Sequence, residues 1–261
     1  MSAFPGTAPP PVVLLCGGLG LRQRADDDDV PKPLRPLPDG RALLLHVLDY
    51  YRAFGLTDFV LCVGYGAEAV EDLLLHEFRV RSHDVRAGAG WHRFEAGGTR
   101  VTLVDGGPWA GKCLRLLQAR EHIGDGPFLL GYGDVLSDFD LGALARRHRA
   151  AGGLLTLTAT RVRSRYGELS VDATMAVTGF EEKPLQPALI SAGYFMCAPG
   201  LFDVLSPDID LEQQVIPLLV ARGAVHAVLH DGLWLPFDTY KDFIDVETLI
   251  HQKGCPWLQP I

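Results

Sequence analysis

The fold is decided by the stretch Val12-Val13-Leu14-Leu15-Cys16-Gly17-Gly18-Leu19-Gly20-Leu21-Arg22. It begins as a short apolar run, which is typical of a buried strand, and it ends in glycines and a cation. Glycines let the backbone turn sharply and let its N–H groups approach phosphate oxygens, because no side chain stands between them. The segment Pro31-Lys32-Pro33 supplies a second cation soon afterwards. The pattern predicts an anion site at the end of the first strand.

The bulk composition narrows the classes of protein that fit. A chain of 261 residues can form one large α/β domain, and a net charge of −8 disfavours general nucleic-acid binding, which needs a basic face. No apolar stretch approaches the ~20 residues that cross a bilayer, and residues 1–11 have no signal-peptide features. The five cysteines lack C-x-x-C pairs, which favours reduced thiols. We predict a cytoplasmic, membrane-free protein with a flexible tail over 1–11 and a single domain over 12–261.

Short apolar strands alternate with amphipathic helices in the first half, which predicts a mostly parallel sheet with helices on both faces. The predicted strands are Val12–Cys16, Asp58–Val63, Arg100–Val104 and Phe128–Leu130, and the predicted helices are Ala42–Phe54, Glu68–Phe78, Lys112–His122 and Leu141–Ala151. Ligands bind beyond the carboxyl ends of parallel strands. We therefore expect the glycine-containing loops that follow the four strands to meet on one rim.

The second half is richer in strands. Its predicted extended segments are Leu154–Arg161, Glu168–Val171, Ala176–Phe180 and Ala188–Cys197, and its predicted helices are Leu211–Arg222 and Tyr240–His251. Residues 81–98 are polar and rich in glycine, which predicts a hairpin or a lid between two core strands. We expect a nucleotide-binding half over residues 12–150 and a second, strand-rich half over 151–261.

Two known glycine motifs can be compared with the chain. The opening segment lacks the spacing of the dinucleotide fingerprint G-x-G-x-x-G, so a Rossmann oxidoreductase is disfavoured. The segment from Gly106 to Lys112 fits the P-loop pattern G-x-x-x-x-G-K, but Cys113 stands where that motif needs a hydroxyl to bind Mg²⁺. Pro108 also removes one backbone N–H from the cradle. A strand-to-helix turn that lines the site is the favoured interpretation.

Two carboxylates stand at predicted strand ends. Asp134 follows Phe128–Leu130, and Asp238 follows the predicted strand Leu233–Leu235. Asp238 could equally cap the helix that begins near Tyr240, because Asp is favoured at helix N-caps. As a pair on one rim with a phosphate loop, the two make a plausible Mg²⁺ site, since Mg²⁺ takes one or two carboxylates together with substrate phosphates.

The set of motifs resembles the sugar-1-phosphate nucleotidyltransferases, and among them the glucose-1-phosphate cytidylyltransferases. The resemblance runs from about Val12 to Trp257. It rests on the opening glycine segment with Pro31-Lys32-Pro33, Gly64-Tyr65, Tyr132-Gly133-Asp134, Tyr166-Gly167, Glu181-Glu182-Lys183-Pro184, Leu211-Glu212, Trp234-Leu235-Pro236-Phe237-Asp238 and Pro256-Trp257. It implies an α/β fold of the nucleotide-diphospho-sugar transferase type, with a Rossmann-like, mostly parallel mixed sheet.

The resemblance also implies a reaction and a set of site residues. A sugar 1-phosphate would join a nucleoside triphosphate, with CTP favoured, and release pyrophosphate with the help of Mg²⁺; the enzyme would often be a homo-oligomer. The implied catalytic residues are Arg22, Lys32, Asp134 and Asp238, and the last two would hold the metal. The implied nucleotide-binding residues are Leu15, Gly17, Gly18, Gly20, Arg22, Lys32, Gly64, Tyr65, Gly111, Lys112 and Gly133. The implied sugar-phosphate-binding residues are Tyr166, Gly167, Glu182, Lys183, Ser191, Gly193 and Glu212.

Two other functions stay open on the sequence alone. A homologue of weak activity could bind a nucleotide sugar without making it. A P-loop NTPase could use Lys112 instead of Lys32.

Overall fold

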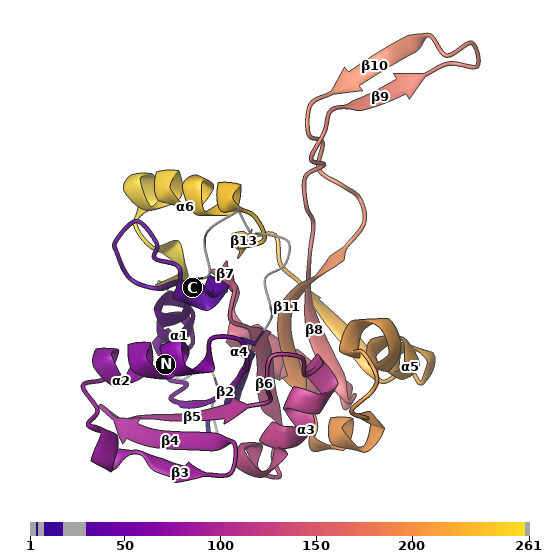
Figure 1. Ribbon diagram of the computed structural model, residues 1–261. Helices are drawn as coiled ribbons and strands as arrows, with labels where there is room; N and C mark the ends of the chain where they lie inside the picture. Colours follow the sequence, from indigo (N-terminus) through magenta and orange to yellow (C-terminus); the bar gives the residue numbers. More distant parts are fainter. Residues whose placement is uncertain (1–3, 5–7, 18–29, 259–261) are drawn as a thin grey trace.

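A computed structural model describes residues 4, 8–17 and 30–258 of the chain. Its centre is a nine-stranded mixed sheet in the order β12-β8-β11-β6-β1-β2-β5-β4-β3 (Figure 1). The strands are β1 (Val12–Leu15), β2 (Asp58–Val63), β3 (Arg86–Gly88), β4 (Trp91–Ala96), β5 (Thr99–Asp105), β6 (Phe128–Tyr132), β8 (Leu155–Thr160), β11 (Ile190–Cys197) and β12 (Val225–Leu229). The α/β mixed sheet predicted from the sequence is confirmed.

Four neighbouring strands, β6, β1, β2 and β5, run parallel. Their registers align the last residues, since Leu15 pairs with both Cys62 and Tyr132, and Val63 pairs with Asp105. The carboxyl ends of these strands therefore lie on one edge of the sheet, as expected from the alternation of strands and helices. Strands β4 and β11 run against their neighbours and make the sheet mixed.

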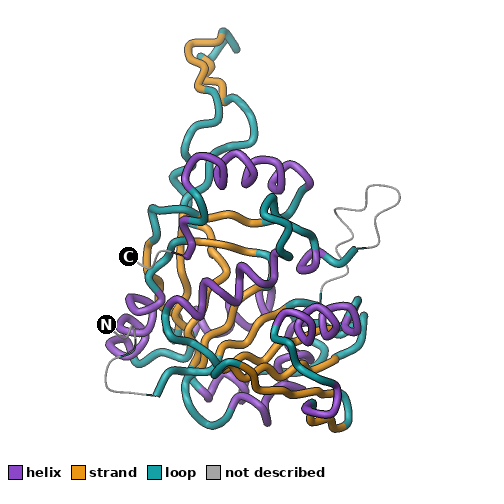
Figure 2. Tube along the Cα trace, turned by 90° about the vertical axis from the view of Figure 1, so that its left-hand side faces the viewer, coloured by secondary structure: helices purple, strands orange, loops and turns teal. Residues whose placement is uncertain are grey.

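Helices cover both faces of the sheet (Figures 1 and 2). They are α1 (Leu43–Ala53), α2 (Ala67–Glu77), α3 (Lys112–Ile123), α4 (Leu141–Ala151), α5 (Ile216–Ala221) and α6 (Tyr240–Lys253). One buried cluster packs α1, α2 and α4 on the sheet, and a second packs α3 and α5 on the other face. Phe4, in the predicted N-terminal tail, is 3% exposed and belongs to the first cluster.

The predicted helix Leu211–Arg222 is divided. A π-helical turn, Leu211–Val215, precedes α5, and the Asp210 side chain caps it by accepting from the N–H groups of Glu212 and Gln213. Pro217 lies in the first turn of α5 and has no N–H for the ordinary helical hydrogen bond. A wider turn at this point accommodates that missing donor.

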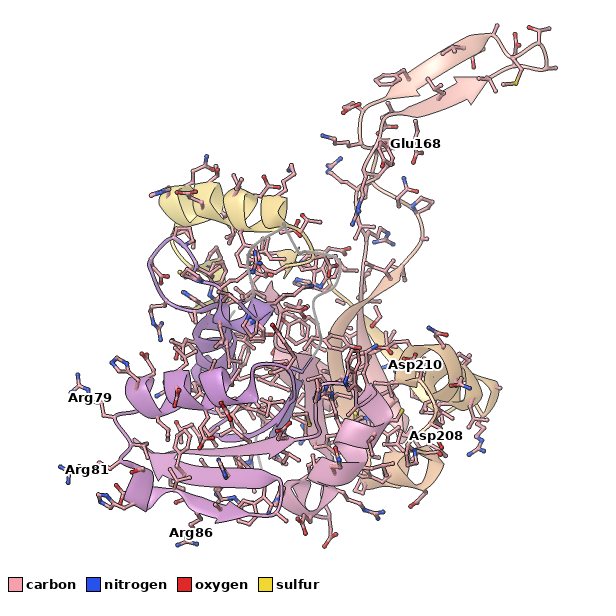
Figure 3. The ribbon with its side chains drawn as sticks, viewed as in Figure 1. Arg79, Arg81, Arg86, Glu168, Asp208 and Asp210 are labelled. Carbon is pink, nitrogen blue, oxygen red and sulfur yellow. The ribbon has the colours of Figure 1, made fainter. Side chains whose placement is uncertain are left out.

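Residues 81–98 form a hairpin and not a lid. Its strands β3 and β4 extend the sheet beyond β5, so β3 is an edge strand. Arg79, Arg81 and Arg86 project into solvent at this corner (Figure 3). Charged side chains along an edge strand discourage pairing with other strands.

Two smaller ribbons complete the fold. Strands β7 (Val135–Ser137) and β13 (Trp234–Pro236) pair antiparallel above the main sheet. Strands β9 (Glu168–Val171) and β10 (Val177–Glu181) form a ribbon that projects far from the body (Figure 1). No helix among the described residues is long and apolar enough to cross a membrane.

Candidate functional site

The loops that follow the four parallel strands meet on one rim. They begin at Cys16-Gly17, Gly64-Tyr65, Gly106-Gly107 and Gly133-Asp134. The backbones approach closely: a Cβ on Gly64 would lie 2.6 Å from the carbonyl oxygen of Gly107, and one on Gly133 would lie 2.6 Å from Sγ of Cys16. Glycine is therefore required at both positions by packing within the rim.

The ribbon of β7 and β13 places the two predicted carboxylates side by side. Asp134 precedes β7 and Asp238 follows β13, and Val135 pairs with Pro236 across the ribbon. The N–H of Phe237 donates to the carbonyl of Asp134 at 3.0 Å. Antiparallel pairing thus brings together two residues that lie about a hundred positions apart in the sequence.

Asp238 does not cap the helix α6. The N-cap is Thr239, which forms a capping box with Asp242. The Asp242 carboxylate accepts from the N–H groups of Asp238 and Thr239. The side chain of Asp238 is thereby left for another partner, and the N-cap alternative is wrong.

That partner is Lys32, which starts the short 3-10 helix Lys32–Leu34. Its ammonium lies 3.4 Å from a carboxylate oxygen of Asp238 and 3.6 Å from one of Asp134. The Lys32 side chain is 16% exposed, whereas that of Asp238 is 59% exposed, so the group opens to solvent on the side of Asp238. Three residues predicted to be catalytic meet at one point.

Two carboxylates share one ammonium, so the group carries an excess negative charge. Burial raises the pKa of Asp134, the nearby Lys32 ammonium opposes that shift, and Asp238 adds to it. Hard oxygen donors of this kind suit Mg²⁺, which completes its shell with water and substrate phosphates. Within the described ranges, no group of three or more His, Cys, Asp or Glu side chains is placed to hold a metal ion. The two carboxylates therefore fit a metal that binds together with a phosphate ligand.

Arg115 on α3 is the residue at the rim that sequence reasoning missed. Its side chain is buried and donates to four backbone carbonyls, those of Val63, Gly17, Gly107 and Ala110. A Cβ on Gly17 would lie 2.0 Å from the guanidinium. Burial lowers the pKa of Arg115, yet a guanidinium stays charged in proteins. Arg115 thus ties three of the four rim loops together and places a cation beneath them.

The same contacts exclude a P-loop between Gly106 and Lys112. A P-loop turns its N–H groups inward toward phosphate. Here the carbonyls of Gly107 and Ala110 point inward and accept from Arg115. Lys112 points elsewhere, toward Glu212.

Lys112 and Glu212, predicted to bind different substrates, form an ion pair. The ammonium of Lys112 lies 2.5 Å from one carboxylate oxygen of Glu212, and the hydroxyl of Tyr132 donates to the other. Burial raises the pKa of Tyr132, and the neighbouring Glu212 raises it further, so the phenol stays protonated. Tyr132 at the end of β6, Lys112 at the start of α3 and Glu212 in the π-helical turn thus contact one another. These contacts connect the two halves of the chain.

Strand β11 supplies two further predicted residues. Gly193 has a φ of +85°, and a Cβ there would lie 2.8 Å from the Tyr132 ring. Its backbone therefore needs glycine for both conformation and space. Ser191 is exposed and lies two residues earlier, toward the start of the strand. The Tyr132 ring thus packs against the backbone of Gly193, while its hydroxyl binds Glu212.

The other four predicted sugar-phosphate residues are not brought to this rim. Tyr166, Gly167, Glu182 and Lys183 belong to the projecting segment between β8 and β11, and Tyr166 is 78% exposed. Glu182 and Lys183 lie 3.7 Å apart and contact each other. In this structure the segment that contains β9 and β10 carries these four residues away from the sheet.

The remaining predicted residues are placed as follows. Leu15 ends the first strand and Gly17 follows it, Gly64 and Tyr65 follow the second, and Gly111 is the N-cap of α3. Gly18, Gly20 and Arg22 lie outside the described residues, and so does the acidic run at 26–29.

The cysteines are free thiols, and four of the five are buried. Burial raises the pKa of Cys62 to about 12 and also raises that of Cys16 at the rim. Both stay protonated at neutral pH, so neither serves as a thiolate nucleophile.

The fold and the rim define a class: an α/β protein with a lysine and two carboxylates beyond the carboxyl ends of its parallel strands, where folds of this kind bind their ligands. The family model described as nucleotidyl transferase matches residues 11–253. The chain belongs to this family.

Individual relatives agree with the match. Glucose-1-phosphate cytidylyltransferase from Salmonella typhi is 33% identical over 253 residues, which cover 94% of this chain and 97% of that protein. A probable mannose-1-phosphate guanylyltransferase from Arabidopsis thaliana is 29% identical over 242 residues, which cover 89% of this chain and 62% of that protein. The structure of HddC from Yersinia pseudotuberculosis, complexed with GMP-PN, has a TM-score of 0.68 at 18% identity and covers 92% of this chain and 99% of its own. The last likeness concerns the fold.

Proposed function

We propose that the protein transfers the cytidylyl group of CTP to a hexose 1-phosphate and releases pyrophosphate. The observation that carries the proposal is Lys32 held between Asp134 and Asp238 at the rim. The relative from Salmonella typhi supports CTP and a glucosyl substrate. The guanylyltransferase relative makes GTP with a mannosyl substrate the main competing pair.

In the proposed reaction, an oxygen of the sugar phosphate attacks the α-phosphorus of the nucleotide. The bond to the β-phosphate oxygen breaks, and pyrophosphate leaves with that electron pair. A phosphate monoester has a second pKa of about 6 and is largely dianionic at neutral pH. The attacking oxygen therefore needs no general base, and the protein contributes positioning and charge stabilisation.

Each residue at the rim has a place in this proposal. Asp134 and Asp238 would hold Mg²⁺, which supplies charge neutralisation between the two phosphate groups when bound. Lys32 stabilises the negative charge that builds on the α-phosphate. Arg115 fixes Gly17 at the start of the glycine turn. We also retain the expectation of a cytoplasmic enzyme, which the five free cysteines support.

Asp134→Asn tests the proposal. We expect pyrophosphate release to fall at least ~100-fold while the unfolding midpoint does not fall, because a preorganised charge is lost and a partly buried carboxylate is neutralised. Asp140→Asn is the matched control: Asp140 caps α4, and asparagine caps a helix as well as aspartate. Near-normal turnover of Asp134→Asn would refute the metal assignment.

The same assay separates the proposal from a binding homologue without turnover. Such a homologue would bind CTP by calorimetry, yet it would release no pyrophosphate with any sugar phosphate.

A further inference from the structure

A cavity of about 350 Å³ lies at the corner where α2 ends and the hairpin of β3 and β4 begins, a volume within the range of small-molecule pockets. Five charged side chains line it: Arg79, Arg86, Arg93, Asp84 and Glu95. Of the two carboxylates, that of Glu95 is already paired with Arg100 at 3.0 Å, and that of Asp84 lies 3.7 Å from a ring nitrogen of His83. The cavity therefore has an excess of positive charge, although the whole chain carries a net charge of −8.

This corner is separate from the rim. Glu95 and Ala96 pair with the first residues of β5, since Ala96 lies opposite Thr99, whereas β5 reaches the rim at its last residue, Asp105. A strand advances by about 3.4 Å per residue, so Thr99 and Asp105 are roughly 20 Å apart. A ligand in the cavity would thus lie at the opposite end of the strand from the rim.

The open edge of β4 forms one wall of the cavity. The N–H of Asp105 donates to the carbonyl of Gly90, and in an antiparallel ladder every second residue then bonds to the same neighbour. By this alternation the backbone N–H and C=O of Glu95 turn away from β5. Strand β3 begins at Arg86, opposite Arg93, so it offers Glu95 no partner. The N–H of Glu95 therefore faces the edge of the sheet at the cavity.

Arg79 occupies a backbone position that favours glycine. Helix α2 ends in a Schellman motif, in which the N–H of Val80 donates to the carbonyl of Leu75 at 2.9 Å and that of Arg79 to the carbonyl of His76 at 3.1 Å. Arg79 has a φ of +53°, in the left-handed region, where a residue with a Cβ is strained. Glycine would end the helix without that strain, so folding alone does not account for an arginine here.

A second pair of arginines is also unfavourable by itself. Arg86 and Arg93 lie directly opposite each other across β3 and β4, so their side chains share one face, and like charges in such a pair repel. Arg93 is held on this face, because its Nε donates to the Thr102 hydroxyl at 2.8 Å and a terminal nitrogen donates to the His122 ring at 3.0 Å. An anion between the two guanidinium groups would replace this repulsion by attraction.

Protection of the sheet edge does not explain these features. A charged side chain of either sign on an edge strand discourages pairing with other strands. That role requires neither an arginine in a glycine position nor two arginines directly opposite each other. Arg79 and Arg86 extend into solvent at this corner (Figure 3), where their long side chains can close on a ligand.

We propose that this corner binds an anion with two phosphoryl groups, with Arg79 on one side and Arg86 and Arg93 on the other. A guanidinium group binds phosphate through two parallel hydrogen bonds, and the N–H of Glu95 supplies a further donor. Inorganic pyrophosphate, a nucleoside diphosphate and a sugar bisphosphate share this chemistry. The site is independent of the proposed function, because none of its residues belongs to the rim.

Calorimetric titration with inorganic pyrophosphate tests the proposal. The protein is Lys32→Met, which lacks the cation of the rim, and divalent ions are omitted so that the rim carboxylates repel the anion. One site per chain is expected. Arg86→Gln in this background should weaken binding at least ~10-fold, because a charge-assisted contact is lost. Arg147→Gln is the matched control: it removes the same charge from an exposed position on α4 and should change the affinity less than ~2-fold.

Arg79→Gly distinguishes a binding role from a structural one. It should also weaken pyrophosphate binding at least ~10-fold, yet raise the unfolding midpoint, because glycine adopts the left-handed conformation without strain. A lower midpoint with unchanged binding would show that Arg79 serves the fold and would overturn its place in the site.

Three further titrations define the ligand. Inorganic phosphate, with one phosphoryl group, should bind at least ~10-fold more weakly than pyrophosphate. CDP and a hexose 1,6-bisphosphate separate the possible sources, since the one that binds most tightly and depends on Arg86 is the better match. Equal affinity for phosphate and pyrophosphate overturns the proposal. So does binding that Arg86→Gln leaves unchanged, or no binding of pyrophosphate, CDP and the bisphosphate.

Discussion

Replacement of Arg115 is the sharpest test of how the rim is built. Arg115→Met keeps much of the side chain's length and removes the guanidinium, which leaves the carbonyls of Val63, Gly17, Gly107 and Ala110 without their donor. Each hydrogen bond to a charged group is worth about 1.5–3 kcal/mol. The variant also avoids the free-energy cost of burying a cation, which offsets part of that sum. We therefore expect the free energy of unfolding to fall by about 3–5 kcal/mol.

Two further variants calibrate this value. Arg115→Lys keeps the charge but cannot reproduce the planar fork, so it should lose about 1–2 kcal/mol. Arg120→Met makes the same substitution on the exposed side of the same helix and should lose less than about 1 kcal/mol, because it removes a cation–π contact with Phe202.

Urea denaturation with linear extrapolation measures these changes. Steady-state kinetics add a second observable: the KM for the nucleotide should rise more than the KM for the sugar phosphate, because Gly17 begins the glycine turn. If Arg115→Met and Arg120→Met lower the free energy of unfolding by the same amount, the Arg115 guanidinium does not stabilise the rim and the reasoning is refuted.

Three further predictions concern other parts of the molecule. Gly193→Ala forces a non-glycine residue into a φ of +85° and against Tyr132, so it should cost about 2–4 kcal/mol of stability in thermal unfolding; a cost below 1 kcal/mol would contradict this. Burial lowers the pKa of His148 in the folded protein, so the unfolded chain takes up the proton first as the pH falls. The free energy of unfolding should therefore decline below pH 6.5, and His148 accounts for at most about 1.4 kcal/mol per pH unit. His148→Gln should flatten that decline in denaturation from pH 7 to 5, and an unchanged slope would refute the assignment. Chelation of Mg²⁺ should stop pyrophosphate release yet shift the free energy of unfolding by less than ~0.5 kcal/mol, because Lys32 already offsets one of the two negative charges and Asp238 opens to solvent; loss of folding would contradict it.

Much of the fold could be predicted because the strands are local patterns. Asp58–Val63, Leu141–Ala151 and Glu168–Val171 have the same bounds in the sequence-based prediction and in the structure. The strands of the first half fall into one parallel set because each apolar run is followed by an amphipathic helix. That alternation is also why Asp134 could be expected at the rim.

The parts that the sequence did not predict depend on contacts between distant segments. Arg115 is the one charged residue among the buried positions of α3, yet only the positions of Val63, Gly17 and Gly107 explain why a cation is buried there. The signal was a charge four residues before Ala119 on an apolar helix face. The direction of the ribbon of β9 and β10 is set by hydrogen bonds between the two chain segments that join it to the sheet, such as that from Ser164 to Pro184, which no local pattern encodes.

The central claim is that Lys32, Asp134 and Asp238 form the centre of a cytidylyltransferase. The most direct measurement is pyrophosphate release across a matrix of the four nucleoside triphosphates and several hexose 1-phosphates, with inorganic phosphate followed in parallel. The claim predicts Mg²⁺-dependent pyrophosphate release that requires both substrates and is fastest with CTP. Release of inorganic phosphate without a sugar phosphate, or no pyrophosphate from any pair, would contradict it.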